Sequence, residues 1–174
     1  MSSLEIEIKA YCSDPAEVER RLAGLGAQYL KERLERDLYF SHPTRDFRKT
    51  DEALRLRLTE EKSFCTYKGP KIGTASKTRE EFEIAVSDFA TAREILLRLG
   101  FIESGRVEKR RRIFSLDSIE VCVDRVDGLG DFVELETHGA ERERLEKELF
   151  DLASRLGLER FERRSYLELV LRGD

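Results

Sequence analysis

The sequence predicts an α+β protein in which an eight-stranded antiparallel β-barrel carries helices on its outer face. Two observations support this fold class. Many segments alternate apolar and charged residues with a period of two, which is typical of strands that bury one face. The helical patterns are too few to connect parallel strands throughout, so neighbouring strands are expected to pair antiparallel. We expect residues 1–174 to form one domain.

Capping residues mark the ends of the expected helices. Asp14 is a candidate N-cap, Pro15 suits the first helical position, and Gly26 ends the first pattern. Two further helical patterns, and a tail that fits either a helix or a strand, cover residues 89–99, 141–156 and 165–172.

Strand patterns fill most of the remaining sequence. They cover residues 4–10, 28–33, 36–41, 53–60, 63–68, 79–86, 101–103, 107–115, 118–125 and 131–137. Two polar segments between them, 42–52 and 69–78, are expected to be loops. The second is rich in Gly, Ser and Thr, so we expect it to be mobile. Residues 127–130 form a turn candidate.

Composition narrows the classes of partner. Charged residues make up 39% of the chain, yet the net charge is only −4, so the two signs are mixed. This balance predicts neither a nucleic-acid nor a membrane partner. Cys12, Cys65 and Cys122 are far apart and form no CxxC motif, which argues against a disulfide framework. Without an apolar leader or a long apolar run, we expect a cytoplasmic protein.

The first strand carries a distinctive charge pattern. Glu5, Glu7 and Lys9 share one face, whereas Ile6 and Ile8 share the other. Two neighbouring carboxylates can hold a hard divalent cation, and the ammonium beside them can hold an anion. A site that handles phosphate is the leading hypothesis.

Other strands repeat this division into an apolar face and a charged face. Their charged sides carry Arg55 and Arg57, then Arg79, Glu81 and Glu83, then Lys109 and Arg111, then Glu120 and Asp124, then Glu134 and Glu136. Each face alone is compatible with a solvated side of an antiparallel sheet. Helices must cover the apolar faces, however, so in a closed barrel the charged faces point inward. A lumen rich in Arg and Lys needs a polyanion, because buried like charges are costly.

This ordered set resembles the CYTH superfamily, also called triphosphate tunnel metalloenzymes. The family signature ExExK on the first strand is present as Glu5, Glu7 and Lys9. Later family segments have counterparts in the same order at Arg55 and Arg57, Lys68, Arg79 to Glu83, Lys109 to Arg111, Asp124 and Glu134. The resemblance covers nearly the whole chain and implies the triphosphate tunnel fold.

The resemblance also implies roles for these residues. The phosphate chain would be bound by Lys9, Arg55, Arg57, Lys68, Arg79, Lys109 and Arg111, of which Lys9, Arg57, Lys109 and Arg111 are the expected catalytic residues. A Mg²⁺ or Mn²⁺ ion would be held by Glu5, Glu7 and Glu134, with help from Asp124 and Glu136. Glu81 and Glu83 are expected to orient the bases through salt bridges.

Within the superfamily, two activities stay open. Residues 127–134 and 164–166 resemble class IV adenylyl cyclases of the CyaB type, which convert ATP to cyclic AMP and pyrophosphate. Glu83 and Glu136 instead resemble the triphosphatase branch, which hydrolyses thiamine triphosphate or inorganic triphosphate. A non-catalytic module that binds triphosphate or polyphosphate is a third hypothesis, against which the retained carboxylates argue. The resemblance also leaves a homodimer open.

Overall fold

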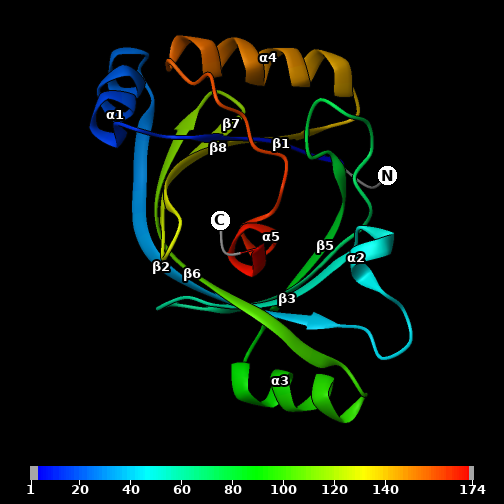
Figure 1. The fold of residues 1–174 in the computed structure, drawn as a ribbon. Helices are drawn as coiled ribbons and strands as arrows, with labels where there is room; N and C mark the ends of the chain where they lie inside the picture. The colour runs from blue at the N-terminus through cyan, green and yellow to red at the C-terminus, as the bar shows by residue number, and fades with distance from the viewer. Residues whose placement is uncertain (1–3, 173–174) are drawn as a thin grey trace.

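Eight antiparallel strands close into a ring in the computed structural model, which describes residues 4–172. The order around the ring is β1-β5-β4-β3-β2-β6-β7-β8 (Figure 1). The strands are β1 (Leu4–Tyr11), β2 (Gln28–Ser41), β3 (Ala53–Leu58), β4 (Ser63–Lys68), β5 (Arg79–Val86), β6 (Ile102–Leu116), β7 (Ile119–Val126) and β8 (Gly130–Gly139). The predicted antiparallel barrel is confirmed.

Two long strands replace four of the predicted short ones. Residues 28–33 and 36–41 belong to the single strand β2, and residues 101–103 and 107–115 belong to β6, so both divisions were wrong. The two strands pair along most of their length, with register shifts at Tyr29/Lys31 and Tyr39/Phe40. These irregularities let long strands bend around the ring without ending.

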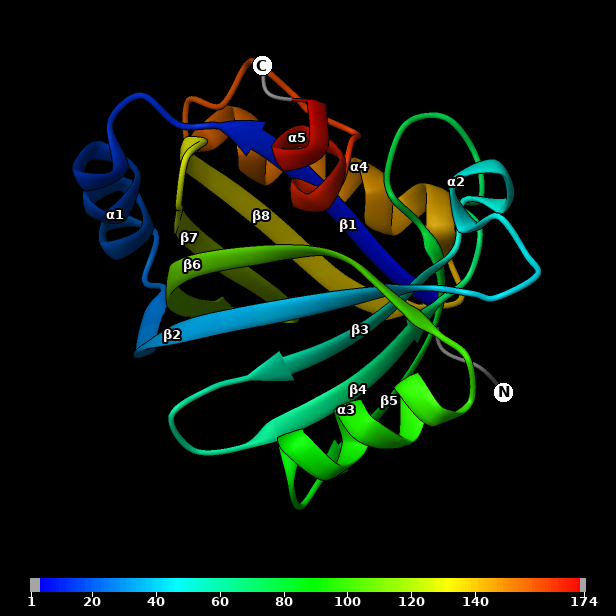
Figure 2. The same ribbon diagram turned by 60° about the horizontal axis from the view of Figure 1, so that its bottom comes forward.

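Three helices cover the outside of the ring: α1 (Pro15–Gly24), α3 (Phe89–Arg98) and α4 (Arg142–Arg155). The Asp14 and Asp88 carboxylates cap α1 and α3, as expected, by accepting hydrogen bonds from the backbone N–H groups of Glu17 and Thr91. Figure 2 shows α3 on the opposite side of the ring from α4. None of the helices in residues 4–172 is long and apolar enough to cross a membrane.

Two shorter helices lie beside the interior of the ring: α2 (Phe47–Thr50) and α5 (Tyr166–Arg172). The first interrupts the segment 42–52, which was expected to be entirely loop. The second resolves the open choice for the tail in favour of a helix. It packs on β6 at Gly105, where an added Cβ would lie 2.5 Å from Leu167 Cδ1. Gly105 therefore lets α5 approach the sheet closely.

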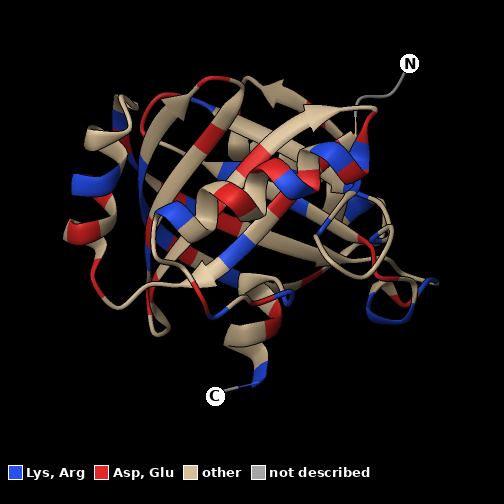
Figure 3. Cartoon of the chain, turned by 90° about the horizontal axis from the view of Figure 1, so that it is seen from above, with Lys and Arg blue, Asp and Glu red and all other residues tan. Residues whose placement is uncertain are grey.

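The apolar faces of the strands form separate cores on the outside of the ring. The largest lies between α1, α4 and the strands β1, β7 and β8, and includes Ile6, Leu22, Val121, Leu135 and Leu149. A smaller core lies under α3. The charged faces consequently point into the ring. On the outer surface, acidic and basic residues alternate along the helices and strands (Figure 3), as the mixed composition predicts.

Candidate active site

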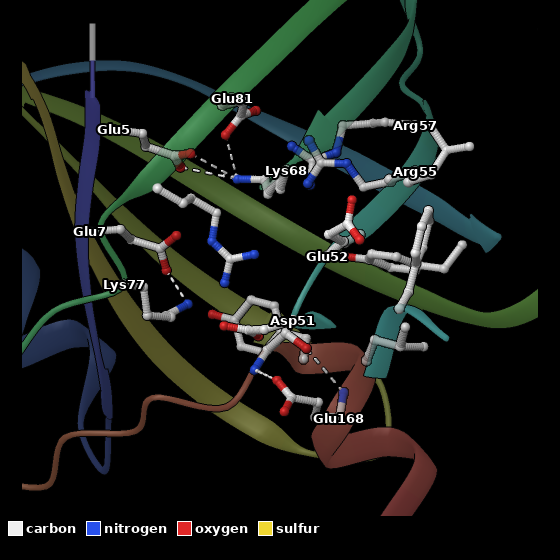
Figure 4. Close-up of a pocket in the computed structure, with 18 of the residues that line it drawn as sticks. Glu5, Glu7, Asp51, Glu52, Arg55, Arg57, Lys68, Lys77, Glu81 and Glu168 are labelled. Atoms are coloured by element: carbon white, nitrogen blue, oxygen red, sulfur yellow. Dashed lines mark hydrogen bonds and ion pairs between the residues drawn. The ribbon is translucent and has the colours of Figure 1, made fainter. Parts of the chain in front are cut away.

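The ring encloses a cavity of about 1150 Å³. Most of the predicted site residues line it, and they come from both halves of the chain. They are Glu5, Glu7, Arg55, Arg57, Lys68, Arg79, Glu81, Glu83, Lys109, Arg111, Glu134 and Glu136. Figure 4 shows ten labelled residues around the cavity, among them Glu5, Glu7, Lys68 and Lys77.

An acidic wall, composed of Glu5 and Glu7 on β1 and Glu134 and Glu136 on β8, forms one side of the cavity. The two strands are neighbours, and their register places Glu7 opposite Glu136 and Lys9 opposite Glu134. Cross-strand partners have their side chains close together on the same face. The alternation in the sequence therefore gathers four carboxylates on one side of the cavity.

Two lysines neutralise part of the acidic wall. Lys68 Nζ lies 3.0 Å from each Glu5 carboxylate oxygen and 2.6 Å from Glu81 Oε2. Lys77, at the end of the loop 69–78, pairs with Glu7 and lies 3.6 Å from Glu134 Oε1. Figure 4 shows the contacts of Lys68 with Glu5 and of Lys77 with Glu7 as dashed lines. Each ammonium occupies a position between carboxylate oxygens.

Glu136 receives no comparable partner. Burial, followed by the charges of Glu5 and Glu7, raises the pKa of Glu136 to about 8. The imidazole Nε2 of His138 lies 3.5 Å from Glu136 Oε1. The acidic wall therefore holds more carboxylate than its own lysines balance.

A basic wall, composed of Arg55 and Arg57 on β3 and Lys109 and Arg111 on β6, forms the other side. Arg57 makes a bidentate pair with Asp37, at 2.7 Å for both hydrogen bonds. Asp37 and Glu35 both belong to β2, which lies between β3 and β6 in the ring. A bidentate fork fixes the guanidinium plane as well as its position.

Lys109 and Arg111 also pair with buried carboxylates. Lys109 Nζ lies 2.7 Å from Glu35 and 3.2 Å from Asp37. Burial alone would raise the pKa of Asp37, but Arg57 and Lys109 outweigh burial and hold that pKa well below its usual range. Arg57 and Lys109 thus have close buried carboxylate partners, whereas Arg55 lies 3.9 Å from Asp37.

Arg111 connects the two walls. Its guanidinium makes a bidentate pair with Asp124, at 2.8 and 2.6 Å, and also bonds Glu134. Asp124 is fully buried and accepts a further hydrogen bond of 2.9 Å from the Tyr166 hydroxyl. Asp124 thus lies behind Arg111 rather than on the cavity surface. Its predicted role as a metal helper remains a prediction.

Lys9 also lies behind the cavity surface. Its ammonium donates a 2.5 Å hydrogen bond to the Arg164 carbonyl and lies 4.1 Å from the centre of the Tyr166 ring. Burial and the neighbouring Lys77 charge lower the pKa of Lys9 to about 7. The predicted contact of Lys9 with phosphate is untested by this arrangement, in which the side chain anchors α5.

The two expected orienting residues do contact bases. Glu81 pairs with Lys68, and Glu83 lies 3.5 Å from Arg55 Nη2 and accepts a 2.7 Å hydrogen bond from Thr66. Arg79 also lines the cavity, on the same strand. These contacts are compatible with an orienting role, which stays a prediction.

Sequence reasoning missed several members of the site: Glu35, Asp37, Lys77 and Tyr166. The signal for Asp37 and Glu35 was their period-two spacing with Arg33, which the wrong division of β2 concealed. Lys77 stands two residues before Arg79, so it extends the inward face of β5. Tyr166 lies in the tail, where no periodic pattern identified the buried face.

The donor set of the acidic wall fits a hard divalent cation. All its donors are carboxylate oxygens, which Mg²⁺ and Mn²⁺ prefer. Within residues 4–172, no three acidic, His or Cys side chains already converge on one point. Burial and the neighbouring carboxylates nevertheless disfavour ionisation of Glu136, and a cation bound there would stabilise its ionised form.

Apolar and aromatic side chains are also part of the cavity lining. Tyr39, Phe47, Leu167 and Leu171 line the cavity, contributed by β2, α2 and α5. Asp51, which ends α2, pairs with Lys71 at 2.8 Å, and Lys71 Nζ lies 3.9 Å from Glu168 of α5. These ion pairs bring α2 and α5 together beside the basic wall.

A closed antiparallel ring with opposed acidic and basic inner walls defines the class of this fold and site. The CYTH domain family model matches residues 3–166, so the chain belongs to that family. The chain is 40% identical over 171 residues to a Methanocaldococcus jannaschii protein, MJ0240, whose name gives adenylate cyclase as a provisional activity. That similarity covers 95% of this chain and 98% of the relative.

Two further similarities agree with this family. Adenylate cyclase CyaB of Aeromonas hydrophila is 29% identical over 173 residues, which cover 95% of this chain and 87% of the relative. The solved structure of the PH1819 protein from Pyrococcus horikoshii has 39% identity and a TM-score of 0.91, covering 98% of this chain and 99% of that one. The fold and the family are therefore shown together.

Proposed function

We propose that this protein is a divalent-metal-dependent enzyme that acts on a triphosphate inside the ring, with the cyclisation of ATP to cyclic AMP and pyrophosphate as its leading reaction. One observation carries this proposal: one cavity inside the ring presents a wall of bases opposite a wall of carboxylates. A triphosphate carries several negative charges, and a metal–triphosphate complex needs both walls at once.

The basic wall is suited to the phosphate chain. Arg55, Arg57, Lys109 and Arg111 line the cavity, and Lys68 and Arg79 add charge from β4 and β5. Guanidinium forks bind phosphate oxygens in a fixed geometry, and lysines act as compact charges. Because their carboxylate partners hold them in place, they stabilise transition-state charge without reorganisation.

The acidic wall is suited to the metal. Glu5, Glu7 and Glu134 would hold Mg²⁺ or Mn²⁺, and Glu136 lies on the same wall. When bound, such an ion neutralises charge on the phosphate oxygens and polarises the phosphorus centre. The residues of this chain contribute orientation, because the cavity lies inside the ring of strands.

The aromatic and aliphatic side chains in the cavity lining favour a nucleoside triphosphate over inorganic triphosphate. A purine ring can pack against Tyr39, Phe47, Leu167 and Leu171, which lie beside the basic wall. In cyclisation, the ribose 3′-hydroxyl loses its proton to water and its oxygen bonds to the α-phosphorus, the bond from that phosphorus to the α–β bridging oxygen breaks, and pyrophosphate leaves with the bond's electron pair. The names of the two curated relatives agree with this reaction.

A triphosphatase is the second candidate. Glu83 and Glu136, whose positions in the sequence resemble the triphosphatase branch, both line the cavity. They would orient a water molecule toward the terminal phosphorus. The water oxygen then bonds to that phosphorus, the bond from the phosphorus to the bridging oxygen breaks, and orthophosphate is released. The substrate would then be inorganic triphosphate or thiamine triphosphate.

Product identification separates the two candidates. The purified protein should be incubated with Mg²⁺ or Mn²⁺ and with ATP, inorganic triphosphate or thiamine triphosphate, and the products resolved by chromatography. Cyclic AMP with an equal amount of pyrophosphate supports the cyclase. Orthophosphate without cyclic AMP, released faster from inorganic triphosphate than from ATP, supports the triphosphatase. Tight binding of triphosphate with no turnover of any substrate would instead indicate a binding module.

Glu7→Gln is the matched test of the metal. This change removes one carboxylate charge from the acidic wall but keeps the shape of the side chain. Turnover should be abolished, and excess chelator should abolish turnover of the wild-type protein. Circular dichroism and thermal unfolding check that the variant remains folded. Full turnover in chelator would exclude the metal.

A further inference from the structure

The loop 69–78 places a lysine inside the ring at its shortest seam. Within residues 4–172, strands β1 and β5 pair only through Leu4 with Glu80 and Glu5 with Arg79. Beyond that point, the backbone N–H of Lys77 donates a 2.8 Å hydrogen bond to the Glu7 carbonyl. Lys77 thus continues the ladder for one more position, and its side chain points to the same face as that of Arg79.

The ammonium of Lys77 bridges two strands. It pairs with Glu7 of β1 and lies 3.6 Å from Glu134 of β8, and the residue is only 6% exposed. These two carboxylates belong to the set that would hold the divalent ion. A tethered positive charge therefore sits among the oxygens that the metal needs.

The two cations exclude each other. Lys77 contacts Oε1 of Glu7 and Oε1 of Glu134, and Arg111 already bonds Oε2 of Glu134. A divalent ion that joins Glu7 to Glu134 therefore competes with Lys77 for Glu134 Oε1, and an ammonium beside a divalent ion is repelled at such short range. The side chain of Lys77 has four rotatable carbons and lines the cavity, so its ammonium can leave the carboxylates and remain inside.

The rest of the loop has other anchors. Ser76 donates a 2.6 Å hydrogen bond to Glu146 of α4, and Lys71 pairs with Asp51 at 2.8 Å. Arg163 donates a 3.1 Å hydrogen bond to the Gly73 carbonyl. Because these contacts do not involve Glu7 or Glu134, the side chain of Lys77 can move while the backbone of the loop stays attached.

We propose that Lys77 is an exchangeable internal counter-cation: it holds Glu7 and Glu134 when no metal is bound, yields them to the divalent ion, and then contacts the phosphate chain. This assignment rests on the proposed function. It makes Lys77 a residue that sets metal affinity and couples metal binding to triphosphate binding.

The first test measures Mn²⁺ binding by calorimetry or by paramagnetic resonance of the free ion. Lys77→Met removes the competing charge and should bind Mn²⁺ at least about tenfold more tightly than the wild-type protein, which corresponds to about 1.4 kcal/mol. Lys71→Met removes a lysine from the same loop that touches neither Glu7 nor Glu134, so its Mn²⁺ affinity should equal that of the wild type. Equal or weaker Mn²⁺ binding by Lys77→Met would overturn the exchange.

The second test uses the wild-type chain, so it does not depend on a folded variant. Lysines are acetylated briefly with an N-hydroxysuccinimide ester, with and without saturating Mn²⁺, and each site is quantified by mass spectrometry. Acetylation of Lys77 should rise severalfold with Mn²⁺, whereas that of Lys71 should not change. A Lys77 signal that is unaffected or lowered by Mn²⁺ would contradict the exchange.

These measurements also distinguish a failure of the Lys77 exchange from a failure of the proposed metal-dependent function. If Mn²⁺ binds the wild-type protein and Lys77→Met equally well, the exchange is wrong and the metal-dependent function stands. If neither protein binds Mn²⁺, both the exchange and the metal-dependent function are contradicted.

Discussion

The two walls of the cavity differ in how their charges are balanced. On the basic wall, Arg57 and Lys109 are held by the buried carboxylates Glu35 and Asp37, which belong to a strand between them. On the acidic wall, Glu7 is balanced by a lysine from a loop, and Glu136 has a pKa raised to about 8 by burial and by its acidic neighbours. Arg57 and Lys109 are thus paired with carboxylates before any ligand binds, whereas Glu136 is placed where its ionised form is disfavoured.

We infer that the basic wall is the fixed part of the site and that the acidic wall is the part where cations exchange. Bidentate pairs within the sheet lock the basic side chains in position, as suits groups that must stabilise charge without moving. On the acidic wall, ionisation of Glu136 is disfavoured by burial and by its acidic neighbours, so a cation from outside the sheet would stabilise the ionised form.

Asp37→Asn should cause the largest loss of stability. Asp37 is 3% exposed and pairs with Arg57 and Lys109, so the substitution leaves buried positive charges without their partner. Breaking a buried ion pair by removing one member costs about 3–5 kcal/mol of unfolding free energy. Urea unfolding of the two proteins measures the change. A variant as stable as the wild type would show that the basic wall is not locked by Asp37.

Arg57→Ala should lower turnover strongly. Arg57 lines the cavity and presents a fixed guanidinium to it. Loss of one preorganised electrostatic partner typically reduces turnover by a factor on the order of a hundred or more. Steady-state kinetics on ATP and on inorganic triphosphate measure the effect. Arg57→Lys keeps the charge but loses the fork, and should fall between the two. Unchanged kcat/KM in Arg57→Ala would remove this residue from the site.

Glu136→Gln should change the pH dependence of stability in the metal-free protein. The folded-state pKa of Glu136 is raised from 4.5 to about 8. Its contribution to stability is therefore fully present below about pH 4.5 and is lost as the pH rises through 8. The unfolding free energy of the wild type should fall relative to that of the variant across this window, by up to about 1.4 kcal/mol per pH unit.

Thermal or urea unfolding of both proteins between pH 5 and 8 measures this difference. Saturating Mg²⁺ should flatten the wild-type curve, because the ion stabilises the ionised carboxylate. Parallel curves for the two metal-free proteins would show that the acidic wall carries no surplus charge.

Glu108→Gln should have the smallest effect and is the surface counterpart of Asp37→Asn. Glu108 pairs with Arg36 at 3.1 Å, but both side chains are about half exposed, at 49% and 58%. Exposed pairs contribute about 0–1 kcal/mol. Urea unfolding should detect little change, and turnover should equal that of the wild type. A loss as large as that of Asp37→Asn would remove the contrast between buried and exposed pairs.

Much of the fold and of the cavity could be predicted from the sequence, because the strands have one apolar and one charged face. The pattern of Glu5, Glu7 and Lys9 is an example: two of these three side chains line the cavity. The period-two rule places such residues on one face without any knowledge of the partner strand. It also predicted Arg55, Arg57 and Lys109 correctly as inward-facing residues.

The rule failed where charges occupy both faces of a strand. In β2, Arg36 points outward to Glu108, while Glu35 and Asp37 point inward to the bases. Without an apolar face, this stretch resembled a break between two strands. The partners that lock the basic wall were therefore missed, since they are defined by neighbours far away in the sequence.

Lys77 was missed for a different reason. Gly, Ser and Thr surround it in the sequence, and such composition predicts a loop but not where its side chains point. Its position follows from one backbone hydrogen bond to Glu7, which depends on the closure of the ring. Tertiary pairing determined this part of the site.

We propose that the acidic wall holds a divalent ion and the basic wall holds the phosphate chain in one cavity. The most direct measurement is a crystal structure of the wild-type protein with Mn²⁺ and inorganic triphosphate, with anomalous diffraction to locate the manganese. We expect an anomalous peak against Glu5, Glu7 and Glu134, and phosphate density against Arg55, Arg57, Lys109 and Arg111. Manganese or triphosphate bound only outside the ring, with this cavity unchanged, would contradict the claim.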